Sequence, residues 1–265
     1  FRIVTICDDN LSIASSAPWI KRLTRSFLLH NLYGVILTNP AAITWYQERW
    51  KSLCRWIYFP IIHKDERFRA ELEKALPLAA DLRSRYRLDH RKGILYVGRL
   101  TPVKNIPLIL RAFSKLQDQE PDARLLLVGD GSSWPALENE CRQLNIASRV
   151  VFAGKQEGPA LMAHYALGDI FVLASYYEPF GAVINEALLS GCQTLCSSIA
   201  GASCLIEENT NGHTYNIYNE DELYLLLKKY LQQLTPPSDT PVQLKANKMP
   251  VHFDALFSQL IQQLR

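Results

Sequence analysis

The chain has 265 residues and a formal net charge of +3, with 48% hydrophobic and 21% charged residues, which indicates a folded globular protein and gives no sign of a nucleic-acid partner. No apolar run approaches the ~18 residues that a membrane-spanning helix needs. The six cysteines show neither metal-ligand nor disulfide-framework spacing. We therefore expect reduced thiols and a cytoplasmic protein, with peripheral contact at the inner face of the membrane left open.

The first sixty residues are predicted to alternate between strands and helices. The predicted strands are 1–7, 34–39 and 55–60, and the predicted helices are 16–32 and 41–50. Ser15 or Ser16 is the expected cap of the first helix, with Pro18 in its first turn. Asp8 and Asp9 are read as a strand-end turn, because two adjacent acids lack the spacing of a metal site. This order predicts parallel pairing with right-handed crossovers.

Positive charge and tryptophan gather in residues 1–65. This quarter holds eight Lys or Arg against four Asp or Glu, and four of the five tryptophans. Such a mixture suits an anionic membrane surface or a lipid-linked acceptor. An ordinary solvated face with core aromatics explains it as well. The chain starts inside the first predicted strand without an initiator Met, so we expect a fragment or a processed chain.

The remainder of the chain predicts a doubly wound α/β domain. Residues 66–92 read as helix and linker. Strands are predicted at 93–99, 123–131 (with its glycine turn), 150–154, 169–175, 193–197 and 214–217, with helices at 107–119, 134–144, 161–167 and 219–234 and one ending at Gly191. Prolines and polar residues at 236–239 break the chain, and 251–264 is a last amphipathic helix.

The stretch 175–189 carries the strongest chemical signal. Glu178 follows a buried strand, a Pro-Phe-Gly passage comes next, and Glu186 lies about one turn into an apolar helix, with seven residues between the two carboxylates. The free N–H groups around Gly181, Ala182 and Val183 open that helix, and a helix start attracts phosphate. Glu186 could then accept ribose hydroxyls and Glu178 sugar hydroxyls. Two solvated surface charges are the alternative, but a Glu within a run of Ala, Val, Ile and Leu needs a reason.

Glu-Pro-Phe-Gly followed by Asn-Glu-Ala resembles the E-x7-E motif of retaining glycosyltransferases with the GT-B fold, most closely family 4 (group 1). A companion motif precedes it as Gly98-Arg-Leu-Thr-Pro-Val-Lys-Asn105. The resemblance covers roughly residues 90–235. It implies an α/β, GT-B-like fold with a partial N-terminal acceptor-side domain (1–88), a Rossmann-type nucleotide-sugar-binding domain (89–235) and a tail helix crossing back to the N-terminal domain (236–265).

The position of Arg99 and Lys104 at a strand end suits a clamp on a diphosphate. By resemblance these two cations stabilise the leaving diphosphate, and Glu178 completes the catalytic set. The resemblance places further contacts to the nucleotide at Glu186, Phe180, Gly181, Ala182, Val183, Gly129, Lys155 and Gln156. An ordinary turn explains Gly129 as well, Lys155 reads equally as a solvated loop residue, and His164 is interpreted as structural. No metal and no cofactor are expected, because the cations are built into the chain.

The chain departs from the family pattern at two places. It reads Gly191-Cys-Gln-Thr-Leu195 where the family usually has Gly-x-Pro-Val. The glycine-rich loop and the acceptor-side histidine of the family have no clear match. The predicted function is a hexosyltransferase of polysaccharide assembly that moves a sugar from a nucleotide-sugar, such as a UDP- or GDP-sugar, to a glycan or lipid-linked acceptor with retention. The alternatives are a catalytically incomplete donor-binding module and a sugar-nucleotide epimerase of the same architecture.

Overall fold

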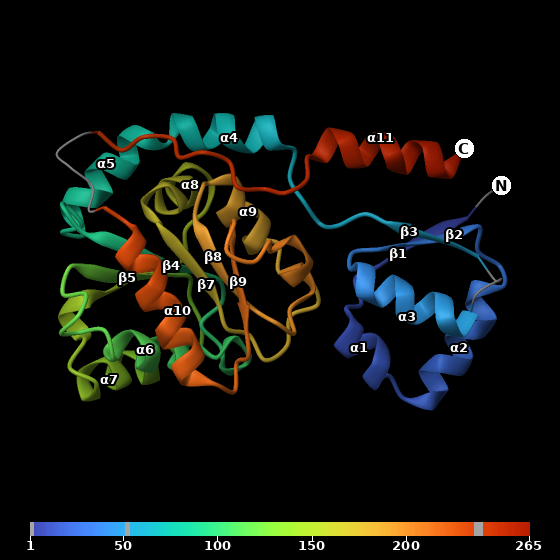
Figure 1. The fold of residues 1–265 in the computed structure, drawn as a ribbon, viewed down its shortest axis with the longest axis horizontal. Helices are drawn as coiled ribbons and strands as arrows, with labels where there is room; N and C mark the ends of the chain where they lie inside the picture. Colours follow the sequence, from blue (N-terminus) through green and yellow to red (C-terminus); the bar gives the residue numbers. More distant parts are fainter. Residues whose placement is uncertain (1–2, 51–53, 236–240) are drawn as a thin grey trace.

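The computed structural model describes residues 3–50, 54–235 and 241–265, and it contains two parallel sheets (Figure 1). The smaller sheet has the order β1-β2-β3, and the larger has the order β6-β5-β4-β7-β8-β9. We call these parts the three-stranded unit and the six-stranded unit. The strands are β1 (Val4–Cys7), β2 (Gly34–Leu37), β3 (Arg55–Tyr58), β4 (Lys92–Val97), β5 (Ala123–Val128), β6 (Val150–Gly154), β7 (Ile170–Leu173), β8 (Gln193–Ser197) and β9 (Gly212–Tyr215).

Helices connect the strands, as parallel pairing requires. They are α1 (Leu11–Ser16), α2 (Trp19–Leu29), α3 (Pro40–Trp50), α4 (Asp65–Lys74), α5 (Leu76–Arg85), α6 (Ile106–Ser114), α7 (Trp134–Gln143), α8 (Gly158–Leu167), α9 (Val183–Leu189), α10 (Glu220–Gln233) and α11 (Phe253–Leu264). Short 3-10 turns lie at η1 (Pro102–Lys104), η2 (Ala147–Arg149) and η3 (Gly201–Leu205). The predicted α/β class is confirmed.

One predicted helix, 16–32, is wrong in its bounds. The chain forms two helices there, because the residue before a proline is pushed out of the helical region and Pro18 has no N–H. Ala17 is accordingly extended, with φ −60° and ψ 133°. Neither serine caps α2, since Pro18 occupies that position without a side-chain hydrogen bond. Asn10 instead caps the additional helix α1 by accepting from the N–H of Ile13.

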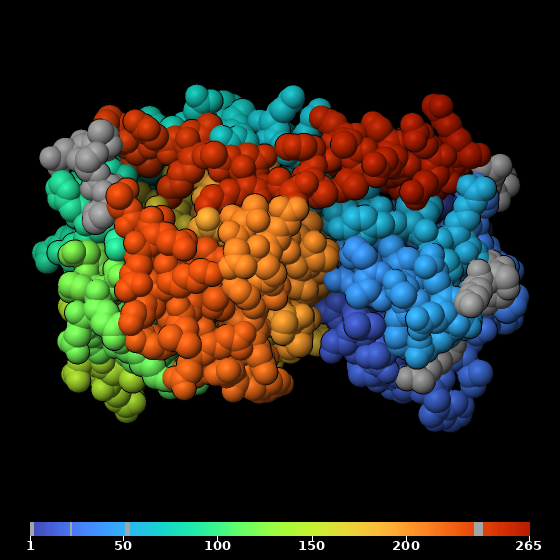
Figure 2. Space-filling model, viewed as in Figure 1, coloured from blue at the N-terminus to red at the C-terminus, as the bar shows by residue number. Residues whose placement is uncertain are grey.

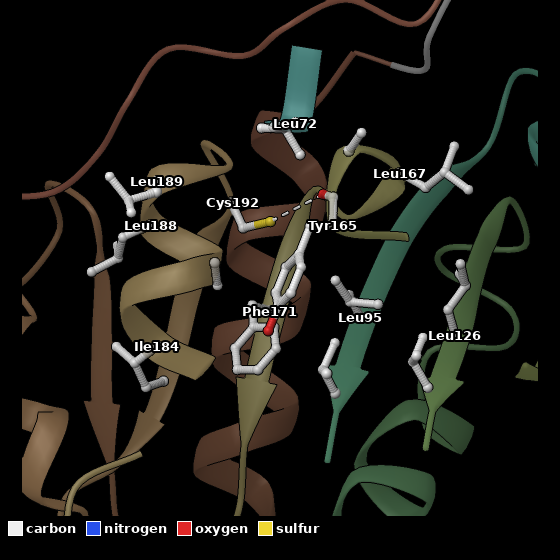
Figure 3. Close-up of a cluster of buried hydrophobic side chains, with 14 of the residues drawn as sticks. Leu72, Leu95, Leu126, Tyr165, Leu167, Phe171, Ile184, Leu188, Leu189 and Cys192 are labelled. Atoms are coloured by element: carbon white, nitrogen blue, oxygen red, sulfur yellow. Dashed lines mark hydrogen bonds between the residues drawn. The ribbon is translucent and has the colours of Figure 1, made fainter. Parts of the chain in front are cut away.

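Helices cover both faces of the six-stranded sheet, and its central strands β4 and β7 are buried along their whole length, which explains their nearly continuous apolar residues. Alternate residues of β4 point into different clusters: Leu95 and Val97 into one, Ile94 and Tyr96 into the other. Helices α4, α5, α8 and α9 contribute to the first cluster, and α6, α7 and α10 to the second. In Figure 3, Tyr165 lies at the centre of the first cluster, between the leucines of β4 and α9. The packing therefore holds α8 and α9 firmly against the sheet.

The chain crosses between the two units twice, once through residues 59–64 and once through the C-terminal tail. Figure 2 shows the tail running along the surface from the six-stranded unit to the three-stranded one. There Leu260 of α11 packs with Ile36 and Ile57, and Arg55 Nη1 donates to the carbonyl of Gln263 at 2.8 Å. The predicted chain break at 236–239 lies outside the described residues.

Two asparagines at the ends of β1 and β2 also join the units. The Asn10 side-chain N–H₂ donates to the carbonyls of Glu178 and Ile199, at 2.9 and 3.0 Å. That of Asn39 donates to the carbonyl of Gly201 at 2.8 Å. Each asparagine also accepts backbone N–H bonds at the start of its own helix. The two sheets therefore face each other through the loops that follow their strands.

Gly129 closes the end of β5 in a conformation that other residues avoid. Its φ is 143°, and an added methyl group would lie 1.9 Å from the carbonyl oxygen of Gly98. We expect Gly129→Ala to lower the free energy of unfolding by about 2–4 kcal/mol, because it adds backbone strain and a steric clash. Urea denaturation measures this. Gly158 has φ 54° with no heavy atom within 4 Å, so Gly158→Ala is a matched control that should lose only about 1 kcal/mol. Equal losses at both positions would contradict this account.

Candidate functional site

The strand order of the larger sheet reverses between β4 and β7, which pair directly through Ile94 with Ile170 and Leu95 with Phe171. Loops that follow adjacent parallel strands diverge at such a point and leave a crevice, where open α/β sheets bind ligands. The loop after β4 carries Arg99 and leads to Lys104, and the loop after β7 carries Glu178. The topology therefore brings the two predicted motifs together.

Lys104 and Glu178 form an ion pair. The distance from Lys104 Nζ to Glu178 Oε2 is 2.5 Å, and the side chains are only 15% and 12% exposed. Ser175 Oγ donates to the same carboxylate oxygen at 3.2 Å, and the N–H of Tyr176 donates to the carbonyl of Val103 at 2.8 Å. An ammonium has three donors, so this pair leaves two donors of Lys104 for a ligand. The sequence indicated both residues but not that they pair.

Arg99 is exposed directly after β4. The Tyr96 hydroxyl donates to its backbone carbonyl at 2.9 Å, which holds the main chain in place. Within the described residues, nothing accepts a hydrogen bond from the Arg99 guanidinium. Its five N–H donors are therefore available to an anion at this edge of the sheet.

The start of α9 has no side-chain cap. The backbone amides of Gly181, Ala182 and Val183 donate to no acceptor in the described part of the chain. These three groups are available to an anion. Phe180 is different, because its side chain is buried in the first hydrophobic cluster and its carbonyl accepts from the N–H of Ala202. Only its backbone N–H is left for a ligand.

Glu186 is held by two side chains from distant parts of the chain. The Tyr165 hydroxyl donates to Oε2 at 2.5 Å, and His63 Nε2 lies 3.1 Å from Oε1. Burial, and after it the charge of Glu186, raises the pKa of Tyr165 well above its usual range, so the hydroxyl stays protonated and donates. These bonds explain how a carboxylate is tolerated within an apolar helix.

A cavity of about 580 Å³ opens beside Glu186, between α4 and α8. Its volume falls within the range of small-molecule sites. The lining combines apolar, basic and acidic side chains: Ile62, His63, Lys64, Arg67, Phe68, Glu71, Leu161, Met162 and Glu186. A ligand group bound to Glu186 would lie next to this cavity.

The minor candidates have local partners. The N–H of Gly129 donates to the carbonyl of Gly154 at 2.8 Å, which links the ends of β5 and β6. Lys155 pairs with Glu157 at 2.6 Å on the surface, and Gln156 Nε2 donates to the carbonyl of Ala153 at 2.7 Å. Ligand contacts at Gly129, Lys155 and Gln156 stay predictions.

His164 is buried, and its ring nitrogens contact the carbonyl of Ala160 at 2.7 Å and the hydroxyl of Tyr86 at 3.1 Å. Burial lowers the pKa of His164. A neutral histidine with both nitrogens paired agrees with its interpretation as structural. Over residues 3–50, 54–235 and 241–265, no group of three or more His, Cys, Asp or Glu is placed to hold a metal ion.

Sequence reasoning missed Tyr165, His63, Ser175 and Asn10. Tyr165 lies 21 residues from Glu186 and His63 lies 123 residues from it. Neither falls in a motif, and Tyr165 in an apolar helix looks like an ordinary core aromatic. Only the packing of α8 and of residues 59–64 against α9 identifies them.

Comparison with known proteins places residues 81–247 in a family described as glycosyl transferases group 1. An uncharacterized glycosyltransferase of Methanocaldococcus jannaschii is 39% identical over 124 residues, which is 47% of this chain and 32% of the relative. The alpha-D-kanosaminyltransferase of Streptomyces kanamyceticus is 32% identical over 133 residues, or 50% of this chain and 34% of the relative. The matches thus span about a third of the length of these relatives.

Solved structures can match a larger share of this chain than the sequence relatives do. Anabaena HepE in complex with UDP and glucose aligns with 99% of this chain and 71% of its own, with a TM-score of 0.74 at 20% identity. The C-terminal domain of the group 1 protein LpcC from Francisella tularensis aligns with 58% of this chain and 82% of its own, with a TM-score of 0.53 at 19% identity. At these identities the likeness concerns the fold.

Tyr165→Phe tests the support of Glu186. The change removes one hydroxyl and leaves a shielded carboxylate with one donor fewer, so we expect a loss of about 2 kcal/mol in the free energy of unfolding. Urea denaturation at neutral pH measures it. The control is Tyr224→Phe, whose hydroxyl bonds Gln119 on the surface and whose loss should stay below about 0.5 kcal/mol. If the two variants are equally stable, the Tyr165 bond does not support Glu186.

Proposed function

The chain belongs to the group 1 glycosyl transferases, a family of retaining hexosyltransferases, and on that premise we propose that it transfers a hexosyl group from a nucleotide-sugar donor with retention at the anomeric carbon. One observation carries the proposal. Where the strand order reverses, the free backbone amides at the start of α9 lie between two carboxylates. Glu178 is paired with Lys104, and Glu186 lies beside a cavity. Such an arrangement suits a ligand with a sugar, a diphosphate and a ribose in succession.

The diphosphate is assigned to Arg99, Lys104 and the amides of Gly181, Ala182 and Val183. Arg99 has its whole guanidinium available, and Lys104 has two free donors. When the bond between the anomeric carbon and the phosphate oxygen breaks, negative charge collects on the diphosphate. Cations and oriented amides already in place stabilise that charge without reorganising.

The two carboxylates take different parts of the donor. Glu186 lines the cavity and is assigned to the ribose hydroxyls. Glu178 contacts Lys104, which is assigned to the diphosphate, so we assign Glu178 to the sugar that adjoins the diphosphate in the donor. Contacts that tighten only as the glycosidic bond breaks affect turnover more than binding.

The proposed acceptor is a glycan or a lipid-linked sugar reached from the membrane surface. None of the helices in the described ranges is long and apolar enough to cross a bilayer. However, α2 exposes one apolar face beside the basic Lys21. The residues of this face, each more than half exposed, are Trp19, Ile20, Leu23, Phe27 and Leu28. An amphipathic helix with aromatic residues on its apolar face is suited to binding at a lipid interface.

A donor-binding module without transfer activity is the second candidate. The stretch that aligns with the two relatives covers only about a third of their own length, which favours this candidate. Both candidates require donor binding, and they differ only in the transfer step.

Paired carboxylate variants test the proposal. UDP, GDP and their glucose and mannose conjugates are titrated by calorimetry in EDTA, because the proposed cations are side chains. Glu186→Gln should weaken nucleoside diphosphate and nucleotide-sugar alike, by about 1.5–3 kcal/mol. Glu178→Gln releases Lys104, so it should spare or tighten nucleoside diphosphate binding while reducing sugar transfer.

The exposed Glu73→Gln on α4 is the matched control and should change neither quantity. If the native chain binds none of these ligands, the proposed function is wrong. A Glu178→Gln variant that weakens plain nucleoside diphosphate as much as Glu186→Gln does would overturn the division of roles. Binding without transfer by the native chain would favour the second candidate.

Vesicle binding tests the membrane contact. The native chain should sediment with vesicles that contain an anionic lipid, because the face of α2 inserts its aromatic side chains below the headgroups. Replacing Trp19 and Phe27 together by Ser should leave most of the protein in the supernatant. Leu225→Ser, at an exposed position of α10, is the control and should behave like the native chain. Undiminished sedimentation of the double variant would rule out this face.

A further inference from the structure

Residues 59–64, between β3 and α4, reach the proposed ribose site where they cross between the units. The backbone N–H of His63 donates to Asn185 Oδ1 at 2.8 Å, and its Nε2 lies 3.1 Å from Glu186 Oε1. The imidazole also packs against the ring of Phe68, with 5.4 Å between centroids. His63 is therefore held through its backbone, its ring face and its Nε2.

The direction of the bond to Glu186 follows from the chemistry of the two groups. An ionised carboxylate only accepts, so His63 Nε2 carries the hydrogen and donates. The two oxygens of a carboxylate offer about four lone-pair positions. Tyr165 uses one on Oε2, and His63 uses one on Oε1. One position remains on each oxygen, which matches the two neighbouring hydroxyls of a ribose.

Both bonds are needed to fix the carboxylate. With Tyr165 alone, the group could turn about its last side-chain bond, because that torsion is broad. A second donor on the other oxygen fixes the plane of the group before the ligand arrives. A group that is already oriented loses less entropy on binding.

We propose that His63 is a positioning residue for the donor, which orients the Glu186 carboxylate so that each oxygen receives one ribose hydroxyl. This role rests on the proposed function, since it assumes that Glu186 meets the ribose. It assigns part of donor recognition to the segment that joins the two units.

A purely structural role is the competing explanation, because His63 belongs to the junction of the two crossings. Asn185 contacts Met249 of the tail as well as His63, with Asn185 Nδ2 3.2 Å from Met249 Sδ. Asp65 accepts from His252 Nδ1 at 2.8 Å, which ties the two crossings to each other. His252 thus shares the junction with His63 but contacts no part of Glu186, so it provides a matched control.

The experiment compares ribose with deoxyribose. UDP and GDP are titrated by calorimetry against their 2′-deoxy counterparts, using the native chain, His63→Ala, His63→Gln and His252→Ala. The native chain should prefer the ribose form by roughly tenfold or more, the worth of a hydrogen bond to a charged group. His63→Ala should reduce that preference at least threefold. His63→Gln keeps an N–H donor at similar reach and should restore most of it, and His252→Ala should leave it unchanged.

Each outcome has a distinct meaning. If His63→Ala weakens ribose and deoxyribose forms by the same factor, His63 is only structural and the inference is wrong, while the proposed function stands. The inference is equally wrong if His252→Ala reduces the preference as much as His63→Ala. If the native chain has no preference for ribose, the assignment of Glu186 to the ribose fails together with the inference. If the native chain binds no nucleoside diphosphate, the proposed function itself fails.

Discussion

The direct pairing of β4 with β7 is the constraint on which the rest of this molecule depends. A parallel sheet must be covered by helices on both faces, so each strand is followed by a loop at the same edge and then by a helix. Because the strand order reverses at β4 and β7, their two loops separate and leave room at the centre of that edge. Lys104 and Glu178, 74 residues apart in the chain, meet there at 2.5 Å.

Three of the charged side chains at this edge have partners within the described part of the chain. Lys104 pairs with Glu178, and Glu186 accepts from Tyr165 and His63. A shielded charge without a partner is costly, so these hydrogen bonds stabilise the edge. In the proposed reaction, the two remaining donors of Lys104 bind the diphosphate while Glu178 stays beside the lysine. The Glu178 carboxylate then adjoins the diphosphate at the position assigned to the sugar.

The attachments between the two units converge on the loops after β7 and β8 and on α9. Asn10 bonds the carbonyl of Glu178, and Asn39 bonds the carbonyl of Gly201. The crossing segments meet Asn185, the residue before Glu186. A change in the arrangement of the two units would therefore disturb the loop of Glu178 and the helix of Glu186. Under the proposed function, domain arrangement and donor binding are physically linked.

The sequence alone determined the α/β class, the two motifs and, to within a few residues at their ends, the nine strands that the structure describes. These features depend on periodicity, turn residues and local spacing. Even the break before Pro18 has a local signal in the restriction that proline imposes on Ala17. The partners of the site depended on the tertiary structure. Tyr165 lies in an apolar predicted helix and His63 lies outside every predicted element, and nothing in a one-dimensional pattern says which distant side chain meets Glu186. Hydrophobic burial on both faces of the sheet brings α8 and residues 59–64 against α9, and only that packing turns an isolated carboxylate into an oriented one.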